Sequence, residues 1–153
     1  MRRAATYTGT APVPGARLAA LTPDGRTLAF AILGDIYVLG ANGGRARAIT
    51  RGLPVDTQPA FSPDGRWIAF LSDRSGAENL WVMRPDGKDA RQVTLHDDDP
   101  IFVSPSWTAD GTGLLVSRYW PDRNAYELWR YPVSGGAGEV VVANRTQGTG
   151  VLW

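Results

Sequence analysis

A four-residue turn phrase recurs three times along this chain and constrains its architecture more than any other feature. It reads TPDG at 22–25, SPDG at 62–65 and TADG at 108–111, and a large apolar residue precedes each copy. The starts at 22, 62 and 108 are 40 and 46 residues apart. Repeats of this length are copies of one supersecondary unit, and each unit buries its faces only against its neighbours. The chain is therefore expected to contain three such units of a longer array.

The second copy shows the unit most clearly. A short strand at 59–62 runs into the turn at 63–65, where proline presets φ and glycine accepts a positive φ. A nearly continuous apolar run at 66–72 follows, which is typical of a strand covered on both faces. Strands at 80–83 and 91–94, joined by a second Pro-Asp-Gly turn, complete the unit.

Four antiparallel strands every 40 to 46 residues, joined by glycine-rich turns, predict an all-β fold of β-propeller blades in an incomplete ring. A three-repeat sandwich is the alternative, but it would not require the same turn at the same place in each unit. The predicted division is an N-terminal extension or the end of a preceding blade at 1–15, blade one at 16–50, blade two at 51–94, blade three at 95–143 and the start of a fourth blade at 144–153.

The segment PAFSPDGRWIAFLSDRSGAENLWVMRPDGKDARQVT resembles the PD-type, WD-like repeat of TolB-like propellers, and the resemblance extends over residues 16–153. Related blades occur in tricorn-type proteases, in prolyl-oligopeptidase-type peptidases and in front of some metal-dependent amidohydrolases. The stretches GDIYVLGANGG, SDRSGAENLWVM and ELWRYPVSGGAGEVV look most like the propeller of the amidohydrolase type. Blade one departs from the pattern because it lacks the S-D-R-x-G loop, and blade three has TADG in place of SPDG.

Composition excludes several classes of function. The net charge is +1 with both signs interspersed, so there is no electrostatic footprint for nucleic acid or anionic lipid. The chain has no cysteine, and no apolar run approaches the roughly 18 residues that span a bilayer. Met1-Arg2-Arg3 resembles the charged head of a signal peptide, but no apolar stretch follows it. The compartment stays open, with a periplasmic or secreted parent slightly favoured over a cytoplasmic one.

The strand order predicts two chemically different ends of each blade. The turns from strand one to two and from three to four are short and glycine-rich, whereas the loops from strand two to three and between blades are longer and more varied. Binding residues are usually found on loops that a rigid scaffold positions, so we expect a ligand at the loop side of the central channel. The candidate ligand-facing residues are Asp73, Arg74, Glu78, His96, Asp97, Asp98, Tyr119, Trp120 and Arg123.

Each of these candidates also has a structural interpretation. The cluster at 96–98 contains one histidine without a spaced partner and matches no zinc pattern, so it is expected to be a solvated acidic loop between blades. Arg74 and Glu78 flank a loop tip and are expected to form an internal ion pair. Tyr119 and Trp120 offer a stacking platform, or they fold their rings over the blade.

The residues of the repeated turns and the tryptophans of the strands are expected to be structural. The turn residues are Asp24, Gly25, Asp64, Gly65, Asp110 and Gly111, and the packing tryptophans are Trp67, Trp81, Trp107 and Trp129.

Catalytic signatures are absent from the sequence. It contains no G-x-S-x-G nucleophile motif, no His-x-His pair and no G-x-x-x-x-G-K phosphate loop. We therefore expect a non-catalytic module, with no cofactor or metal of its own, that binds protein or peptide or controls access to an attached catalytic domain. The alternative is the N-terminal propeller of an amidohydrolase or a prolyl-oligopeptidase-type peptidase. Three blades would leave two bare end faces, which predicts self-association, for example head-to-tail into a six-blade ring.

Overall fold

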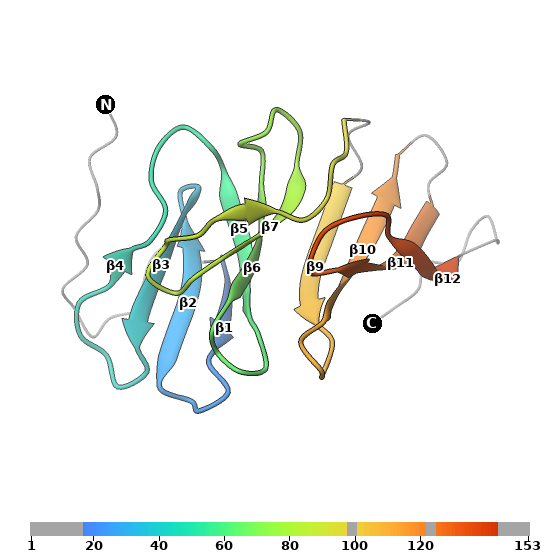
Figure 1. Cartoon of the computed structure of the whole chain (residues 1–153). Coiled ribbons are helices and arrows are strands. Elements are labelled where there is room, and N and C mark those ends of the chain that lie inside the picture. Colours follow the sequence, from blue (N-terminus) through green and yellow to red (C-terminus); the bar gives the residue numbers. More distant parts are fainter. Residues whose placement is uncertain (1–16, 98–100, 122–124, 144–153) are drawn as a thin grey trace.

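Each repeat of the sequence forms one antiparallel sheet in the computed structural model, which describes residues 17–97, 101–121 and 125–143 (Figure 1). The regular structure of these residues is entirely β-strand, arranged as three four-stranded sheets. The expected all-β fold of four-stranded blades is therefore confirmed. The predicted segments at 1–15 and 144–153 lie outside the described residues.

The strands follow one another in chain order across each sheet. Blade one contains β1 (Arg17–Leu21), β2 (Thr27–Ile32), β3 (Asp35–Gly40) and β4 (Arg47–Ala48). Blade two contains β5 (Asp56–Phe61), β6 (Ile68–Ser72), β7 (Asn79–Met83) and β8 (Arg91–Gln92). Blade three contains β9 (Ile101–Trp107), β10 (Gly113–Trp120), β11 (Ala125–Pro132) and β12 (Glu139–Ala143).

The blades lie side by side in the order of the sequence, from blue to orange in Figure 1. The first strand of each blade contacts the first strand of the next, β1 against β5 and β5 against β9, so these strands form the inner side of the arc. The repeated turns at 22–25, 62–65 and 108–111 mark the turn end of the blades. The opposite end, where β6 leads into β7 and β8 leads into β9, is the loop end.

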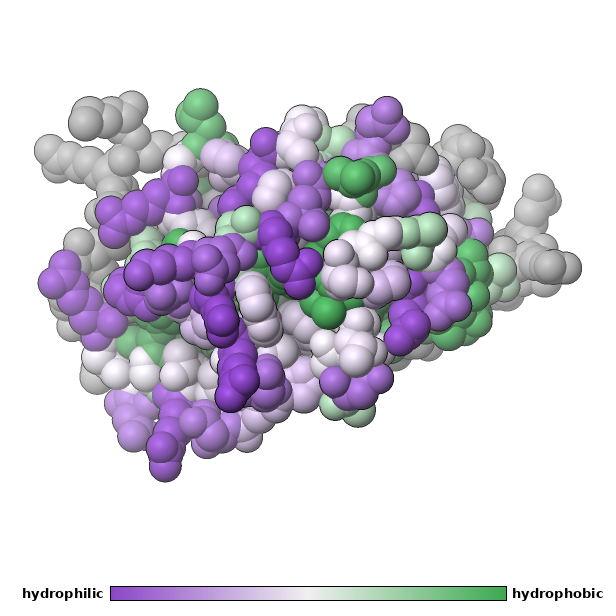
Figure 2. Space-filling model, viewed as in Figure 1, coloured by the Kyte–Doolittle hydropathy of each residue, from purple (hydrophilic) through white to green (hydrophobic). Residues whose placement is uncertain are grey.

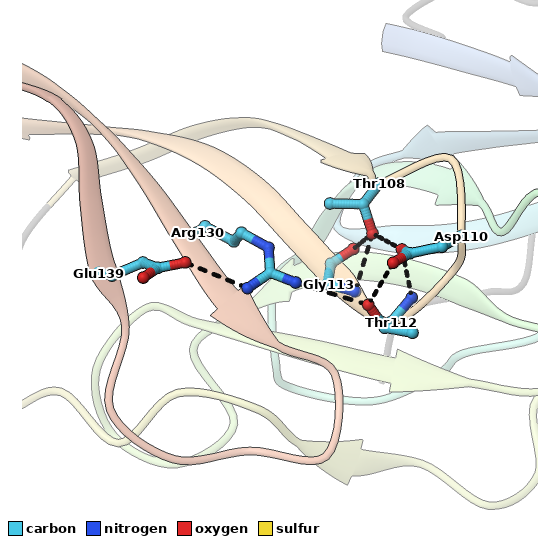
Figure 3. Close-up of polar contacts among 6 residues, drawn as sticks. All are labelled: Thr108, Asp110, Thr112, Gly113, Arg130 and Glu139. Atoms are coloured by element: carbon cyan, nitrogen blue, oxygen red, sulfur yellow. Dashed lines mark hydrogen bonds and ion pairs between the residues drawn. The ribbon is translucent and has the colours of Figure 1, made fainter.

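The repeated turns are held by the same local hydrogen bonds in all three blades. In blade three, the Thr108 hydroxyl donates to Asp110 Oδ1 at 2.5 Å, and the same oxygen accepts the backbone N–H of Thr112 at 3.0 Å (Figure 3). The Thr108 hydroxyl also accepts the N–H of Gly113 at 2.9 Å. These bonds lower the pKa of Asp110 to about 2, chiefly through the Thr108 hydroxyl, and the corresponding bonds lower the pKa of Asp24 and of Asp64.

The turns of neighbouring blades also touch one another. A Cβ built on Gly65 would lie 3.6 Å from the Pro23 ring, and one on Gly111 would lie 3.9 Å from the Pro63 ring. Each of these glycines has φ near +70°, a conformation that costs an L side chain about 1–2 kcal/mol. The Pro-Asp-Gly phrase therefore serves both its own turn and the contact between blades.

Two hydrophobic clusters hold the blades together. Between blades two and three, the buried side chains are Ala69, Leu71, Leu80, Val82 and Val93 from blade two and Phe102, Leu114, Val116 and Tyr131 from blade three. Between blades one and two, they are Ala29, Ile36, Val38, Ile68, Phe70 and Met83. Trp67, Trp107 and Trp129 pack against the first cluster and Trp81 against the second, as the sequence pattern predicts.

The two end faces of the arc differ. The face of blade one that points away from blade two carries a buried cluster of Phe30, Ile32, Tyr37 and Ala46. In blade three the outermost strand, β12, is exposed along its whole length, whereas Ser117 in the middle of the outward face is buried. The expectation of two bare end faces is therefore wrong for blade one, because the described residues there are already buried.

Candidate functional site

The loop from β6 to β7 brings three of the predicted residues to the inner part of the loop end. It leaves the sheet at Ser72, carries Asp73, Arg74 and Glu78, and re-enters the sheet at Asn79, which pairs with Ser72. The first strands of blades two and three begin beside it, because Asp73 bonds to the residue before β5 and Glu78 bonds to β9. The loop is thus fixed to both blades at the loop side of the arc.

Arg74 is held in place by charge, by a hydroxyl and by two aromatic faces. Its Nη2 lies 2.7 Å from Asp56 Oδ1, and its Nε donates to the Ser72 hydroxyl at 2.9 Å. Its guanidinium carbon lies 5.0 Å from the ring centroids of both Phe70 and Trp81, within the range of a cation–π contact. The expected Arg74–Glu78 pair is wrong, because the first strand supplies a buried carboxylate closer to Arg74.

The two acidic residues of the loop bond to backbone N–H groups, one just before β5 and one in β9. Asp73 Oδ1 accepts the N–H of Val55 at 2.7 Å, and Glu78 Oε1 accepts the N–H of Phe102 at 3.1 Å. Burial raises the pKa of Glu78, and the negative charge of Asp73 raises it further, against the opposing effect of the Phe102 N–H. This end of the molecule therefore carries two carboxylates that repel each other, while the cation of the same loop is bonded to Asp56.

Asn79 ties the chain after β8 back to the same loop. Its side chain is buried, it accepts the Thr94 hydroxyl at 2.8 Å and the N–H of His96 at 2.9 Å, and its amide donates to the carbonyl of His96 at 2.9 Å. The His96 ring then lies 5.5 Å from the ring of Phe102, and its Nε2 is 3.1 Å from the Tyr131 hydroxyl. The expected solvated loop is therefore wrong for His96, which packs between blades, whereas Asp97 is exposed.

The aromatic pair of blade three is split between the two faces of the sheet. Tyr119 stacks on Tyr126 with ring centroids 4.6 Å apart, on the face that points away from blade two. On the other face, the guanidinium of Arg118 lies 4.4 Å from the Trp120 ring, and Trp120 Nε1 donates to Glu127 at 3.2 Å. Tyr119 and Trp120 therefore do not form one stacking platform.

Comparison with known proteins places this architecture in a family. The sequence matches the family described as the tricorn protease N-terminal beta propeller domain over residues 18–151. The chain belongs to this family. The uncharacterised peptidase YuxL of Bacillus subtilis (strain 168) is 40% identical over 85 residues, which are 54% of this chain and 12% of that protein. The Tol-Pal system protein TolB of Bordetella pertussis is 49% identical over 59 residues, 38% of this chain and 14% of that protein.

A solved structure shows the same fold. The putative TolB from Agrobacterium tumefaciens superimposes with a TM-score of 0.74 at 24% identity, over 87% of this chain and 50% of that one. The resemblance to TolB-like propellers is therefore confirmed, and the chain spans half or less of the length of these relatives. These relatives are TolB proteins and a peptidase, so they give no support to the amidohydrolase association.

In this tricorn-type propeller, the predicted candidates fall into two groups. Asp73, Arg74 and Glu78 lie together, and Asn79 connects them to the chain at His96 and Asp97. Tyr119 and Trp120 lie at the end of β10 in blade three, and Asp98 and Arg123 lie outside the described residues.

The sequence reasoning missed the residues that organise the loop end, namely Asp56, Asn79, Arg118, Glu127 and Tyr131. One repeated residue in the sequence could have pointed to part of this network. Blades one and two both end in threonine, and the hydroxyls of Thr50 and Thr94 accept the N–H of Ile36 and Leu80 at 2.8 and 2.9 Å. This repeated threonine marks the position where the start of the third strand is hydrogen-bonded to the chain that follows the fourth strand.

A cleft at the turn end was not expected. It measures about 390 Å³ between blades two and three and is walled by Trp67 and Trp107, with Asp64, Asp110 and Arg91 at its margins. Its polar groups are bonded internally: Trp107 Nε1 donates to the carbonyl of Ala60 at 3.0 Å, and Arg91 Nη1 donates to that of Val133 at 2.6 Å.

The polar groups of the loop end mainly hold the loops in place. Across 17–97, 101–121 and 125–143, no group of three His, Asp or Glu side chains is placed to hold a metal ion. Within the same ranges, no helix is long and apolar enough to cross a membrane. The polar groups of the loop end instead fix loops to strands, which leaves a rigid surface with carboxylates at its rim.

Proposed function

We propose that this chain is a non-catalytic propeller module that binds a positively charged, extended segment of a partner protein at the loop end of blades two and three. The observation that carries the proposal is the pair of neighbouring carboxylates, Asp73 and Glu78, whose mutual repulsion contributes to the raised pKa of Glu78. A lysine or arginine from a partner would relieve that repulsion. Asp97, exposed on the adjoining chain, adds a third negative charge to the same end.

The scaffold around the carboxylates supports binding. Asp73 accepts the backbone N–H of Val55, just before β5, and Glu78 accepts that of Phe102 in β9, so both carboxylates are held in fixed positions before a partner arrives. Preorganised groups lose little conformational freedom on association, which favours affinity. Opposite charge on the partner would also speed the encounter, most strongly at low salt.

A labelled octapeptide of alternating lysine and valine provides the first probe, with binding followed by fluorescence anisotropy. The double variant Asp73→Asn, Glu78→Gln keeps both acceptor oxygens and removes both charges, so we expect affinity to fall by about 10-fold or more. Asp86→Asn is the matched control, because Asp86 is half-exposed beside Lys88, in a turn of blade two away from this loop. Equal affinity of the double variant and the wild type, or equal binding of a glutamate–valine peptide, would contradict the proposal.

A second candidate function is that the module selects substrates for an attached peptidase domain. The supporting observations are the family assignment and the 40% identity to a peptidase. In a longer protein that contains this chain and a peptidase domain, the same double variant would raise KM for basic peptides and leave kcat unchanged. An unchanged KM would exclude this role for the loop end.

A further inference from the structure

The cleft at the turn end, between blades two and three, combines aromatic walls with charged groups of both signs. Trp67 of blade two and Trp107 of blade three line it, and Asp64, Asp110 and Arg91 lie at its margins. Its volume of about 390 Å³ is within the range of small-molecule sites in proteins. The repeated turns lie along the lower edge of the molecule in Figure 1, and Figure 2 shows mainly hydrophilic atoms along that edge. The cleft is therefore an aromatic site in a polar surface.

The two tryptophans distinguish this junction between blades from the one before it. The turn phrases stack in the same way at both junctions, with the glycine of one turn against the proline of the preceding turn. Trp67, however, stands where blade one has Thr27, and Trp107 stands where blade two has Phe61. The aromatic walls are therefore a property of these two positions and not of the repeat.

Both indole rings are held in place by contacts within the protein. Trp107 Nε1 donates to the carbonyl of Ala60 at 3.0 Å. The guanidinium carbons of Arg84 and Arg91 lie 4.6 and 5.5 Å from the centroid of the Trp67 ring, within the range of cation–π contacts. Rings that are fixed in advance lose little conformational freedom when a ligand binds.

Asp64 and Arg91 keep hydrogen-bonding capacity that the fold does not use. Asp64 Oδ1 accepts the Ser62 hydroxyl at 2.6 Å and the N–H of Arg66 at 3.0 Å, and no bond among the described residues uses its Oδ2. These bonds lower the pKa of Asp64, chiefly through the Ser62 hydroxyl, so the carboxylate stays ionised near neutral pH. Arg91 uses Nη1 for the carbonyl of Val133, and no bond to a described residue uses its Nη2. One strong acceptor and one strong donor therefore remain at the cleft.

We propose that this cleft binds a neutral pyranose ring of a sugar, with its C–H face against the indole rings and its hydroxyls bonded to Asp64 and Arg91. A cation is disfavoured because two guanidinium groups already lie over Trp67. An anion is disfavoured because two carboxylates, Asp64 and Asp110, stand at the margin. Sugar hydroxyls both donate and accept, so they suit a site that offers a carboxylate and a guanidinium. The site lies at the end opposite the carboxylates of the loop end, so it does not depend on the function proposed for them.

Saturation-transfer NMR of the 153-residue chain, with the methyl glycosides of glucose, galactose and mannose at about 5 mM each, tests the site. We expect transfer to the ring C–H protons of at least one sugar, with a dissociation constant on the order of 1 mM. Tetramethylammonium and acetate are the cationic and anionic probes under the same conditions. No transfer to any of the sugars, whether or not an ion binds, would overturn the proposal.

Maltotriose, compared with methyl glucoside, distinguishes the two sources of a pyranose ring. Tighter binding of maltotriose would support a site for one unit of a longer glycan, and equal binding would support a site for a free sugar.

Substitutions test whether the sugar lies in the cleft. Trp67→Thr introduces the residue that blade one has at this position, and Asp64→Asn keeps an acceptor oxygen for the turn while it removes the charge. Each should weaken sugar binding by about 5-fold or more. Asp24→Asn is the matched control and should leave the affinity unchanged, because Asp24 accepts the same two turn bonds in blade one, at 2.6 and 3.0 Å. Equal weakening by Asp24→Asn and Asp64→Asn, or unchanged binding by both cleft variants, would overturn the proposal.

Discussion

Gly87 marks a place where the backbone of blade two lies directly against the backbone of blade one. A Cβ built on Gly87 would overlap the carbonyl oxygen of Ile49 and lie 3.2 Å from its carbonyl carbon. Gly43 holds the corresponding place in the turn of blade one, and nothing lies within 4 Å of its Cβ position. The two glycines have nearly the same φ, +88° and +91°, and each N–H bonds to the carbonyl three residues earlier.

Substituting each of the two glycines by alanine measures the effect of the contact between blades, as the difference between the two losses of unfolding free energy. Gly43→Ala should cost about 1–2 kcal/mol of unfolding free energy, the price of a left-handed L residue. Gly87→Ala should cost that amount plus about 1–3 kcal/mol, because overpacking against a carbonyl forces the blades apart. Gly135→Ala in blade three should behave like Gly43→Ala, since its Cβ would make an ordinary contact of 3.7 Å with Val93.

Urea unfolding followed by tryptophan fluorescence provides the assay, with the slope m checked for constancy so that differences in midpoint report stability. Gly87→Ala should be the least stable of the three variants by at least about 1 kcal/mol. Equal losses within about 0.5 kcal/mol would show that the turn of blade two does not rest on blade one.

Three further outcomes are expected. At pH 7, Glu78→Gln should raise the urea concentration at the midpoint of unfolding. Because the pKa of Glu78 is raised in the folded state, the ionised side chain destabilises the fold only above its ordinary pKa of 4.5. The difference in midpoint between the variant and the wild type should therefore disappear below pH 4.5. Trp107→Ala should lower the free energy of unfolding by about 3 kcal/mol, because the ring packs between blades. Trp107→Phe should lower it by about 1 kcal/mol, because the hydrogen bond to Ala60 is lost. A loss below about 1 kcal/mol for Trp107→Ala would mean that the ring does not pack between blades. Asn79→Ala should lower the free energy of unfolding by about 2–4 kcal/mol, because the N–H and the carbonyl of His96 lose their side-chain partner. Thermal unfolding of Asn79→Ala, compared with that of Ser75→Ala, would measure how much these bonds stabilise the fold.

The blades and their turns were predictable because strand pattern and turn chemistry act over short stretches. The expected boundaries nevertheless shifted where pairing decided them. The first strand of blade two begins at Asp56 rather than at 59, because a bulge with Gln58 in the left-handed region lets Thr57 and Asp56 continue the pairing with β6. The fourth strand of blade two is only Arg91–Gln92, because the chain beyond it turns inward toward Asn79.

The same bulge recurs in blade three, and its chemistry could not be inferred from the repeat. Ser104 also has a positive φ, and its N–H is bonded at 2.6 Å to the side chain of Gln58 in the preceding blade. Both residues precede a proline, a pattern that is visible in the sequence. The hydrogen bond between them crosses 46 residues, so only the stacking of the blades reveals it.

Sequence separation thus explains why one end of the molecule was easier to predict than the other. At the turn end, Asp110 bonds to Thr108 and Thr112, each two residues away, so the pattern is local and repeats with the phrase. At the loop end, Arg74 finds its partner 18 residues away and Glu78 finds its own 24 residues away. Such contacts depend on strand register and on the neighbouring blade, which a single repeat does not encode. Apart from the threonine bonds that recur in blades one and two, the bonds of the loop end do not maintain the repeat. The loop end is therefore free to vary between blades, which is what a binding surface on a periodic scaffold requires.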